Sequence, residues 1–116
     1  MMGNPFVYPL CDQVVTVYGL LDGKCTRRVL ENVYYAWEDI RQETEEGIRL
    51  DRRFLLIVPG ACQQVFPGDR VFDGIGPEAV DWEAFLPATV PGLSQVDYAR
   101  VWRWDGRIVH TEAGRK

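Results

Sequence analysis

The stretch "VVTVYGLLDGKCTRRVLENVYYAW", residues 14–37, decides the fold. Two runs rich in β-branched and aromatic residues flank Asp22-Gly23, a dipeptide that accepts the positive φ angles of a tight hairpin turn. The second run, residues 29–37, places apolar side chains on both faces of a strand. We therefore expect a hairpin whose second strand lies inside a sheet, away from its edges.

Further strands and turns are expected along the rest of the chain. Pro67-Gly68 suits the central positions of a type II turn, and Asp105-Gly106 predicts a second hairpin between "QVDYARVWRW" and "RIVHTE". The segment "RFLLIVPG" is typical of a buried strand that ends at Pro59-Gly60. A shorter strand is expected over residues 70–72.

Two segments are less regular. "PEAVDWEAFLP", residues 77–87, predicts one short helix, because Pro77 suits a first turn and Val80, Trp82 and Phe85 share an inward side. The polar segment 38–53 offers only Ile40 as an apolar anchor before Gly47. It is compatible both with a short helix over 39–46 and with an exposed loop.

These elements predict a mainly β fold, a small β-barrel or sandwich of about six to seven antiparallel strands with one short helix. A chain of 116 residues is the size of a single domain, 1–116. Residues 1–10 are expected to form an N-terminal extension, and residues 113–116 a flexible C-terminal tail.

Composition excludes several functions. The formal charge of −4 and scattered arginines argue against a protein that grips nucleic acid by itself. The sequence shows no long apolar run and no leader pattern, so we expect no membrane segment and an intracellular product. Three cysteines without a C-x-x-C pair, and a single histidine, predict buried reduced thiols, no metal and no cofactor.

His110 and Glu112 lie two residues apart on one strand face and form the most plausible acid–base pair. Because the spacing places no nucleophile beside them, we predict no catalytic residues and no enzyme. A small hydrolase using this pair and one cysteine is kept as an alternative. A second alternative is a cytoplasmic small-ligand-binding β module, with an aromatic pocket beneath Trp37 and Trp82.

The last hairpin favours a protein–protein contact instead. Strand alternation puts Trp102 and Trp104 on one face, and so small a domain buries only some of its four tryptophans. The predicted interaction surface consists of Trp102, Trp104, His110, Arg115, Lys116, Arg52 and Arg53.

Several short motifs resemble a family of small proteins from the structural gene modules of tailed phages and prophages of Gram-positive bacteria. They are Thr16-Val17-Tyr18, the turn-strand Gly68-Asp69-Arg70-Val71 with Gly74, and the ending His110 with Ala113-Gly114-Arg115-Lys116. The proline-broken segment 77–91 departs from the family pattern.

The resemblance implies a non-enzymatic virion component, a head-closure, head–tail joining or minor capsid protein. Such proteins are small β-barrels that assemble as rings beneath the portal, and their loops seal or open the DNA channel. The implied partners are portal, adaptor or tail proteins and further copies of the chain, with DNA passing nearby but not bound specifically. The implied location is the bacterial host cytoplasm during assembly and afterwards the virion.

Overall fold

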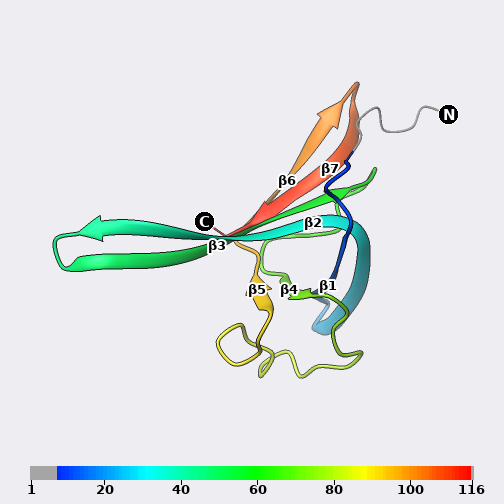
Figure 1. Cartoon of the computed structure of the whole chain (residues 1–116). Coiled ribbons are helices and arrows are strands. Elements are labelled where there is room, and N and C mark those ends of the chain that lie inside the picture. The colour runs from blue at the N-terminus through cyan, green and yellow to red at the C-terminus, as the bar shows by residue number, and fades with distance from the viewer. Residues whose placement is uncertain (1–7, 116) are drawn as a thin grey trace.

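The computed structural model describes residues 8–115, except for the side chain of Asp51. It is mainly β, as predicted, and its strands belong to one antiparallel sheet of order β5-β4-β1-β2-β3-β7-β6 (Figure 1). The seven strands are β1 (Gln13–Leu21), β2 (Lys24–Thr44), β3 (Gly47–Pro59), β4 (Arg70–Asp73), β5 (Leu93–Gln95), β6 (Tyr98–Trp104) and β7 (Arg107–Gly114).

A bend in β2 gives the sheet its shape. Asn32 has a φ of 56° and lies where the pairing with β1 shifts by one residue, between Gln13 and Val15. Such a bulge bends a strand and increases its twist. The first part of β2 therefore pairs with β1, and the part after Val33 pairs with β3 in a second section of the sheet.

The sheet is not closed into a barrel, although its two ends approach each other. β5 and β6, the outermost strands, are consecutive in the chain and are joined through Val96 and Asp97. The amide of Asp97 donates to the carbonyl of Gly114 (2.9 Å), and that of Gly68 to the carbonyl of Val96 (2.8 Å). These bonds extend the β6–β7 and β4–β5 pairings, and within the described residues no ladder joins β5 to β6.

The core lies between the two sections. Both sections contribute fully buried side chains, among them Val17 of β1, Val33 of β2 and Leu56 of β3. Burial of a Val or Leu side chain stabilises a fold by about 1.5–3 kcal/mol. Tyr35 of β2 also lies in this core, where its hydroxyl bonds to that of Ser94 (2.6 Å) and so joins β2 to β5.

The predicted helix over 77–87 does not form in the described residues, where this segment is a series of turns. Its inward side is nevertheless as predicted, because Val80, Trp82 and Phe85 pack with Tyr18 in a second apolar cluster. Arg70 explains the turns: its guanidinium donates to the carbonyls of Trp82 and Phe85. These carbonyls bond to the body of the protein and not to a following helical turn.

Residues 38–53 form neither a helix nor a loop. They are the outer ends of β2 and β3, which pair from Tyr34↔Ile57 out to Thr44↔Gly47 and form a two-stranded arm (Figure 1). The arm, defined here as residues 38–53, extends the molecule to 55 Å along its longest axis. Within the described residues, no helix is long and apolar enough to cross a membrane.

The terminal segments are more ordered than expected. Strand β7 continues to Gly114, so Ala113 and Gly114 are buried and paired with β3 and are not a flexible tail. Tyr8 lies on β7, where its hydroxyl meets His110. The other residues expected in the tail and the extension, Lys116 and residues 1–7, lie outside the described residues.

Candidate interaction surfaces

The structure divides the predicted interaction residues between two projecting hairpins. Arg52, Arg53 and Arg115 lie at the root of the arm, where β7 runs beside β3 (Figure 1). Trp102, Trp104 and His110 lie on the hairpin of β6 and β7. The residues predicted to form one interaction surface therefore belong to two separate surfaces. Lys116 lies outside the described residues.

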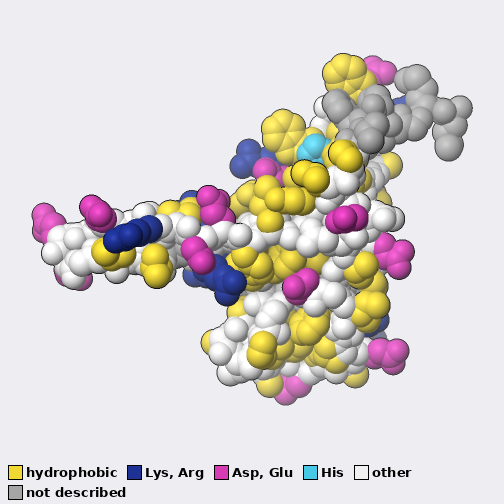
Figure 2. All heavy atoms as spheres, in the orientation of Figure 1, with side chains coloured by type: hydrophobic (Ala, Val, Ile, Leu, Met, Phe, Trp, Pro, Cys, Tyr) yellow, Lys and Arg dark blue, Asp and Glu magenta, His cyan; other side chains and the backbone are white. Residues whose placement is uncertain are grey.

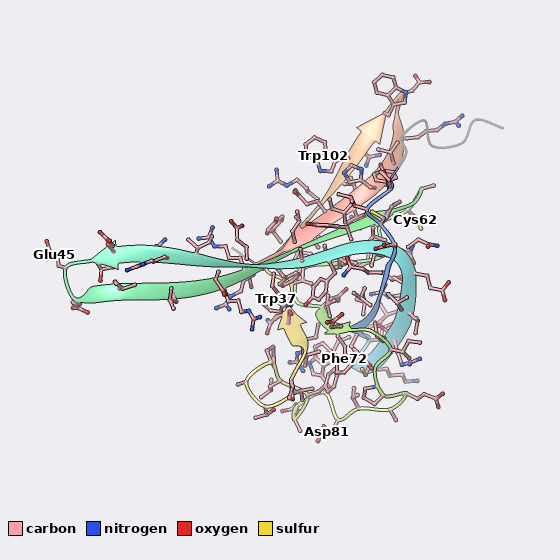
Figure 3. The ribbon with its side chains drawn as sticks, in the orientation of Figure 1. Trp37, Glu45, Cys62, Phe72, Asp81 and Trp102 are labelled. Atoms are coloured by element: carbon pink, nitrogen blue, oxygen red, sulfur yellow. The ribbon has the colours of Figure 1, made fainter. Side chains whose placement is uncertain are left out.

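The arm is exposed along its length. On the face that continues the core side of β3, Leu50 is 71% exposed and Ile48 is 58% exposed. Figure 2 shows charged and apolar side chains interspersed on the arm, and Glu45 marks its tip in Figure 3. Exposed branched apolar side chains on a free ribbon are suited to contact with another molecule.

Cross-strand pairs hold the arm in register. Acidic residues gather in its first strand and arginines in its second, so that Glu38 lies opposite Arg53 and Asp39 opposite Arg52. The Asp39–Arg52 pair is 3.6 Å long and exposed, a kind of pair that contributes about 0–1 kcal/mol. At the tip, the hydroxyl of Thr44 donates to the carbonyl of Gly47 (2.9 Å).

The arm root is the point where the arm joins the core. The guanidinium of Arg52 lies 4.7 Å from the centre of the Trp37 ring, and Arg115 donates to the carbonyl of Arg52 (3.3 Å). Trp37 packs in turn on Tyr35 and Phe54. The arm therefore starts from an aromatic cluster that belongs to the core.

The second surface is the outer face of the β6–β7 hairpin, with Trp102 49% exposed. Its ring stacks on His110 with 5.9 Å between the ring centres. Tyr8 bonds to Nδ1 of His110 (2.7 Å), and its ring meets that of His110 edge-on. Trp102, stacked on His110, thus presents an exposed aromatic ring, and aromatic residues are enriched at interface centres.

His110 and Glu112 do not form the acid–base pair considered from the sequence. Glu112 forms an ion pair with Arg100 (3.1 Å), while Nδ1 of His110 is hydrogen-bonded to the hydroxyl of Tyr8. Burial lowers the pKa of His110, and the nearby Glu112 carboxylate opposes that shift. Burial therefore favours the neutral form of the imidazole, whose ring contacts Tyr8 and Trp102.

A groove of about 690 Å³ runs over the outer side of the arm root and the start of β6. Its lining combines aromatic rings and guanidinium groups: Tyr34, Trp37 and Tyr98 with Arg53, Arg100 and Arg115. Trp82 packs elsewhere, in the cluster with Tyr18 and Phe85. The two tryptophans expected above one pocket thus belong to different parts of the molecule.

The Gly-Asp-Arg-Val motif has a structural role in this chain. Asp69 Oδ2 accepts hydrogen bonds from the amide of Phe66 (2.9 Å) and from Arg28 (3.1 Å). Burial raises the pKa of Asp69, against the opposing effects of Phe66 and Arg28. Arg70 points the other way and stacks on Trp82 at 3.7 Å. The motif therefore fixes two loops to β4.

The cysteines correct another expectation. Cys11, Cys25 and Cys62 are free thiols, but Cys25 and Cys62 are exposed and not buried. Burial raises the pKa of Cys11, and the nearby Asp12 adds to that rise. No group of three or more histidine, cysteine or acidic side chains within residues 8–115 is arranged to hold a metal ion.

Comparison with protein-family models, curated proteins and solved structures gave no match to this chain. The geometry described above is therefore the basis for any functional inference, beside the motif resemblance.

The sequence reasoning expected contacts from residues 38–53 but missed that they form a two-stranded hairpin, although a signal for it was present. Residues 38–46 carry five acids and one arginine, and residues 49–53 carry three arginines. Folding the segment back at Glu45-Glu46 places these opposite charges across from each other, as favourable cross-strand pairs require. The pattern could have identified a charged hairpin without any apolar alternation.

Proposed function

We propose that this chain is a non-enzymatic component of a phage or prophage virion, a head-closure or head–tail joining protein. It works by contacts with neighbouring subunits in a ring. The observation that carries the proposal is the arm, a ribbon that leaves the body and exposes Ile48 and Leu50. The motif resemblance supplies the virion setting.

The shape of the chain suits an assembly subunit. A body with a packed core supports one long projection, and the aromatic cluster at Trp37 fixes its root (Figure 3). Interface energy commonly comes from a few apolar or aromatic anchors surrounded by polar contacts. On the arm, Ile48 and Leu50 are such anchors, and the charged residues around them set partner and register.

The charge of the arm suits a place beside DNA without a grip on it. Glu45 and Glu46 form the tip, and Glu43 precedes them. Like charge keeps a phosphate backbone from adhering to such a tip. The proposal thus places DNA nearby as a passing molecule, with portal, adaptor or tail proteins as partners. The chain is made in the host cytoplasm and then resides in the virion.

The test uses particles produced by the host prophage. Mass spectrometry of purified particles is expected to detect the chain, and electron microscopy to locate it between head and tail. An arm-shortened variant, with 41–50 replaced by Asn-Gly, retains the body because Ile40 and Asp51, which pair across the strands, then flank a dipeptide that closes a tight hairpin. This variant is expected to give heads that fail to join tails or to retain DNA.

Glu78→Gln, an exposed change in the loop after β4, is the control and is expected to assemble normally. Absence of the chain from the particles, or normal particles from the arm-shortened variant, would overturn the proposal.

A second candidate function is favoured by the groove at the arm root. Its volume of about 690 Å³ is that of a small-molecule site, and its arginines and tyrosines suit an anionic aromatic ligand. Titration of aromatic carboxylates and nucleotides against tryptophan fluorescence would test it, with Arg100→Gln as the variant. No saturable change with any of these ligands would remove the candidate.

A further inference from the structure

Two strand edges of the molecule have a partner on one side only within residues 8–115. Strand β1 pairs with β2 no further than Val33, so the β2 edge of the arm is open. Strand β6 is the last strand of the sheet and pairs only with β7. An open edge is a template for pairing with another chain.

The two edges have the same length and carry opposite charge. The β2 part of the arm, Glu38–Thr44, has seven residues, as does β6, Tyr98–Trp104. Glu38, Asp39 and Glu43 against the single Arg41 make the arm edge acidic overall, whereas Arg100 and Arg103 make the β6 edge basic. Complementary charge of this kind steers partners and fixes their register.

The direction of the backbone groups selects a register. The side-chain amide of Gln13 bonds to both the N–H and the C=O of Tyr35, so these groups face the open edge. Because the direction alternates along a strand, Asp39 and Glu43 face that edge too.

On β6, Trp104 flanks the two-residue turn at Asp105-Gly106 and faces Arg107 of β7. The extra residue of the nearby bulge lies in β7, opposite Trp102 and Arg103, so the alternation along β6 is intact. Arg103 therefore faces the open edge of β6.

From these observations we propose that the arm of one copy adds to the β6 edge of a second copy as an antiparallel strand. Asp39 then lies opposite Arg103 of the second copy, and Ile40 lies opposite Trp102. In this register the edge-facing residues of both strands meet, Asp39 and Arg103 form a charge pair, and all seven residues overlap. A contact between two different surfaces of identical chains is head-to-tail and closes into a ring when the rotation permits.

This contact names the partner within the proposed ring and rests on the proposed function for that setting. A seven-residue strand pair is a small interface, so the purified chain is expected to associate weakly and reversibly. Ion pairs at an exposed edge are screened by salt, so low ionic strength is expected to strengthen the association.

The experiment is sedimentation equilibrium of the purified chain over a wide concentration range at low salt. Asp39→Arg and Arg103→Asp are each expected to weaken self-association by about tenfold or more, through like-charge opposition. An equimolar mixture of the two variants is expected to recover hetero-association, because the arginine arm of one then meets the aspartate edge of the other.

Glu78→Arg makes the same charge change as Asp39→Arg at an exposed site elsewhere and is expected to associate as the wild type does. Both altered positions are exposed, so each variant is expected to fold, and circular dichroism checks this. A wild-type chain that stays monomeric, variants that associate normally, a mixture that does not recover, or an equal loss in Glu78→Arg would each overturn the contact. If the purified chain is monomeric but particles contain it between head and tail, the contact is overturned and the proposed function still stands.

Discussion

The arm and the body are built from the same two strands, yet they follow different physical rules. Near the core, β2 and β3 place Tyr35 and Leu56 in an apolar cluster, and packing fixes their geometry. Further out, the same strands hold each other by backbone pairing and exposed charge pairs. Stability thus comes from the core part of the two strands, while the arm is available for contacts.

A matched pair of leucines on β3 gives the sharpest test. Leu56 is fully buried and Leu50 is 71% exposed, and both point to the core side of the strand. Leu56→Ala is expected to lower the free energy of unfolding by about 2–5 kcal/mol, and Leu50→Ala by less than about 0.5 kcal/mol. Urea denaturation followed by tryptophan fluorescence measures both, and equal losses would remove the distinction between arm and body.

Two arginine–tryptophan contacts extend the comparison. Arg70 stacks on Trp82 and also donates to two carbonyls in the buried loop, whereas Arg52 stacks on Trp37 at the exposed root. Arg70→Met is expected to cost about 1.5–3 kcal/mol, because hydrogen bonds from a charged group are lost. Arg52→Met is expected to cost about 0–1 kcal/mol. Thermal unfolding scans measure the stability loss of each variant. A loss in Arg52→Met as large as that in Arg70→Met would show that the arm root is as tightly packed as the loop.

Gly114 lies where the body closes beneath the arm root. A Cβ atom there would lie 2.6 Å from the carbonyl oxygen of Phe54 and 2.9 Å from the hydroxyl of Tyr98. Because the closest atom is backbone, Gly114→Ala is expected to cost about 1–3 kcal/mol through overpacking. Ala113 is the adjacent control, since Ala113→Gly removes atoms and adds none. If urea denaturation shows unchanged stability for Gly114→Ala, the backbones of β3 and β7 can move apart enough to accept the added methyl group.

The smallest expected effect concerns pH at the second hairpin. Burial lowers the pKa of His110 in the folded chain, so the unfolded state binds a proton first as pH falls through about 6.5. The contribution of His110 to stability is therefore complete above that pH and is lost on acidification toward the lower folded pKa. The nearby Glu112 carboxylate reduces this effect.

His110→Gln removes the titrating group. Its stability is expected to fall less than that of the wild type between pH about 7.5 and about 5.5. Identical pH profiles in denaturant titrations would exclude His110 as the source.

The body was more predictable than the arm because its signals are local. Asp22-Gly23 and Asp105-Gly106 both turn with positive φ, and Gly68 adopts a φ of 91° as a type II turn requires. The mainly β class followed from these turns and from the β-branched runs. Trp102 and Trp104 are exposed, as the alternation of the last hairpin predicted.

The remaining features depend on contacts distant in the chain. The helix over 77–87 is replaced by turns because Arg70 and Tyr18 bond to carbonyls of that segment. The arm lacks apolar alternation, so periodicity could not distinguish it from a loop. The bend at Asn32 follows from the register against Gln13, which no pattern within β2 indicates.

The unbroken course of β3 has a mechanical consequence. Its 13 residues run from the arm tip to Pro59, and residues 55–59 are paired with β7. Bonds between antiparallel strands lie across the strand axis. A pull on the arm tip therefore loads the bonds between β3 and β7 sideways and all together, the direction in which a ladder resists most, so tension on the arm is carried into the body without peeling the sheet apart.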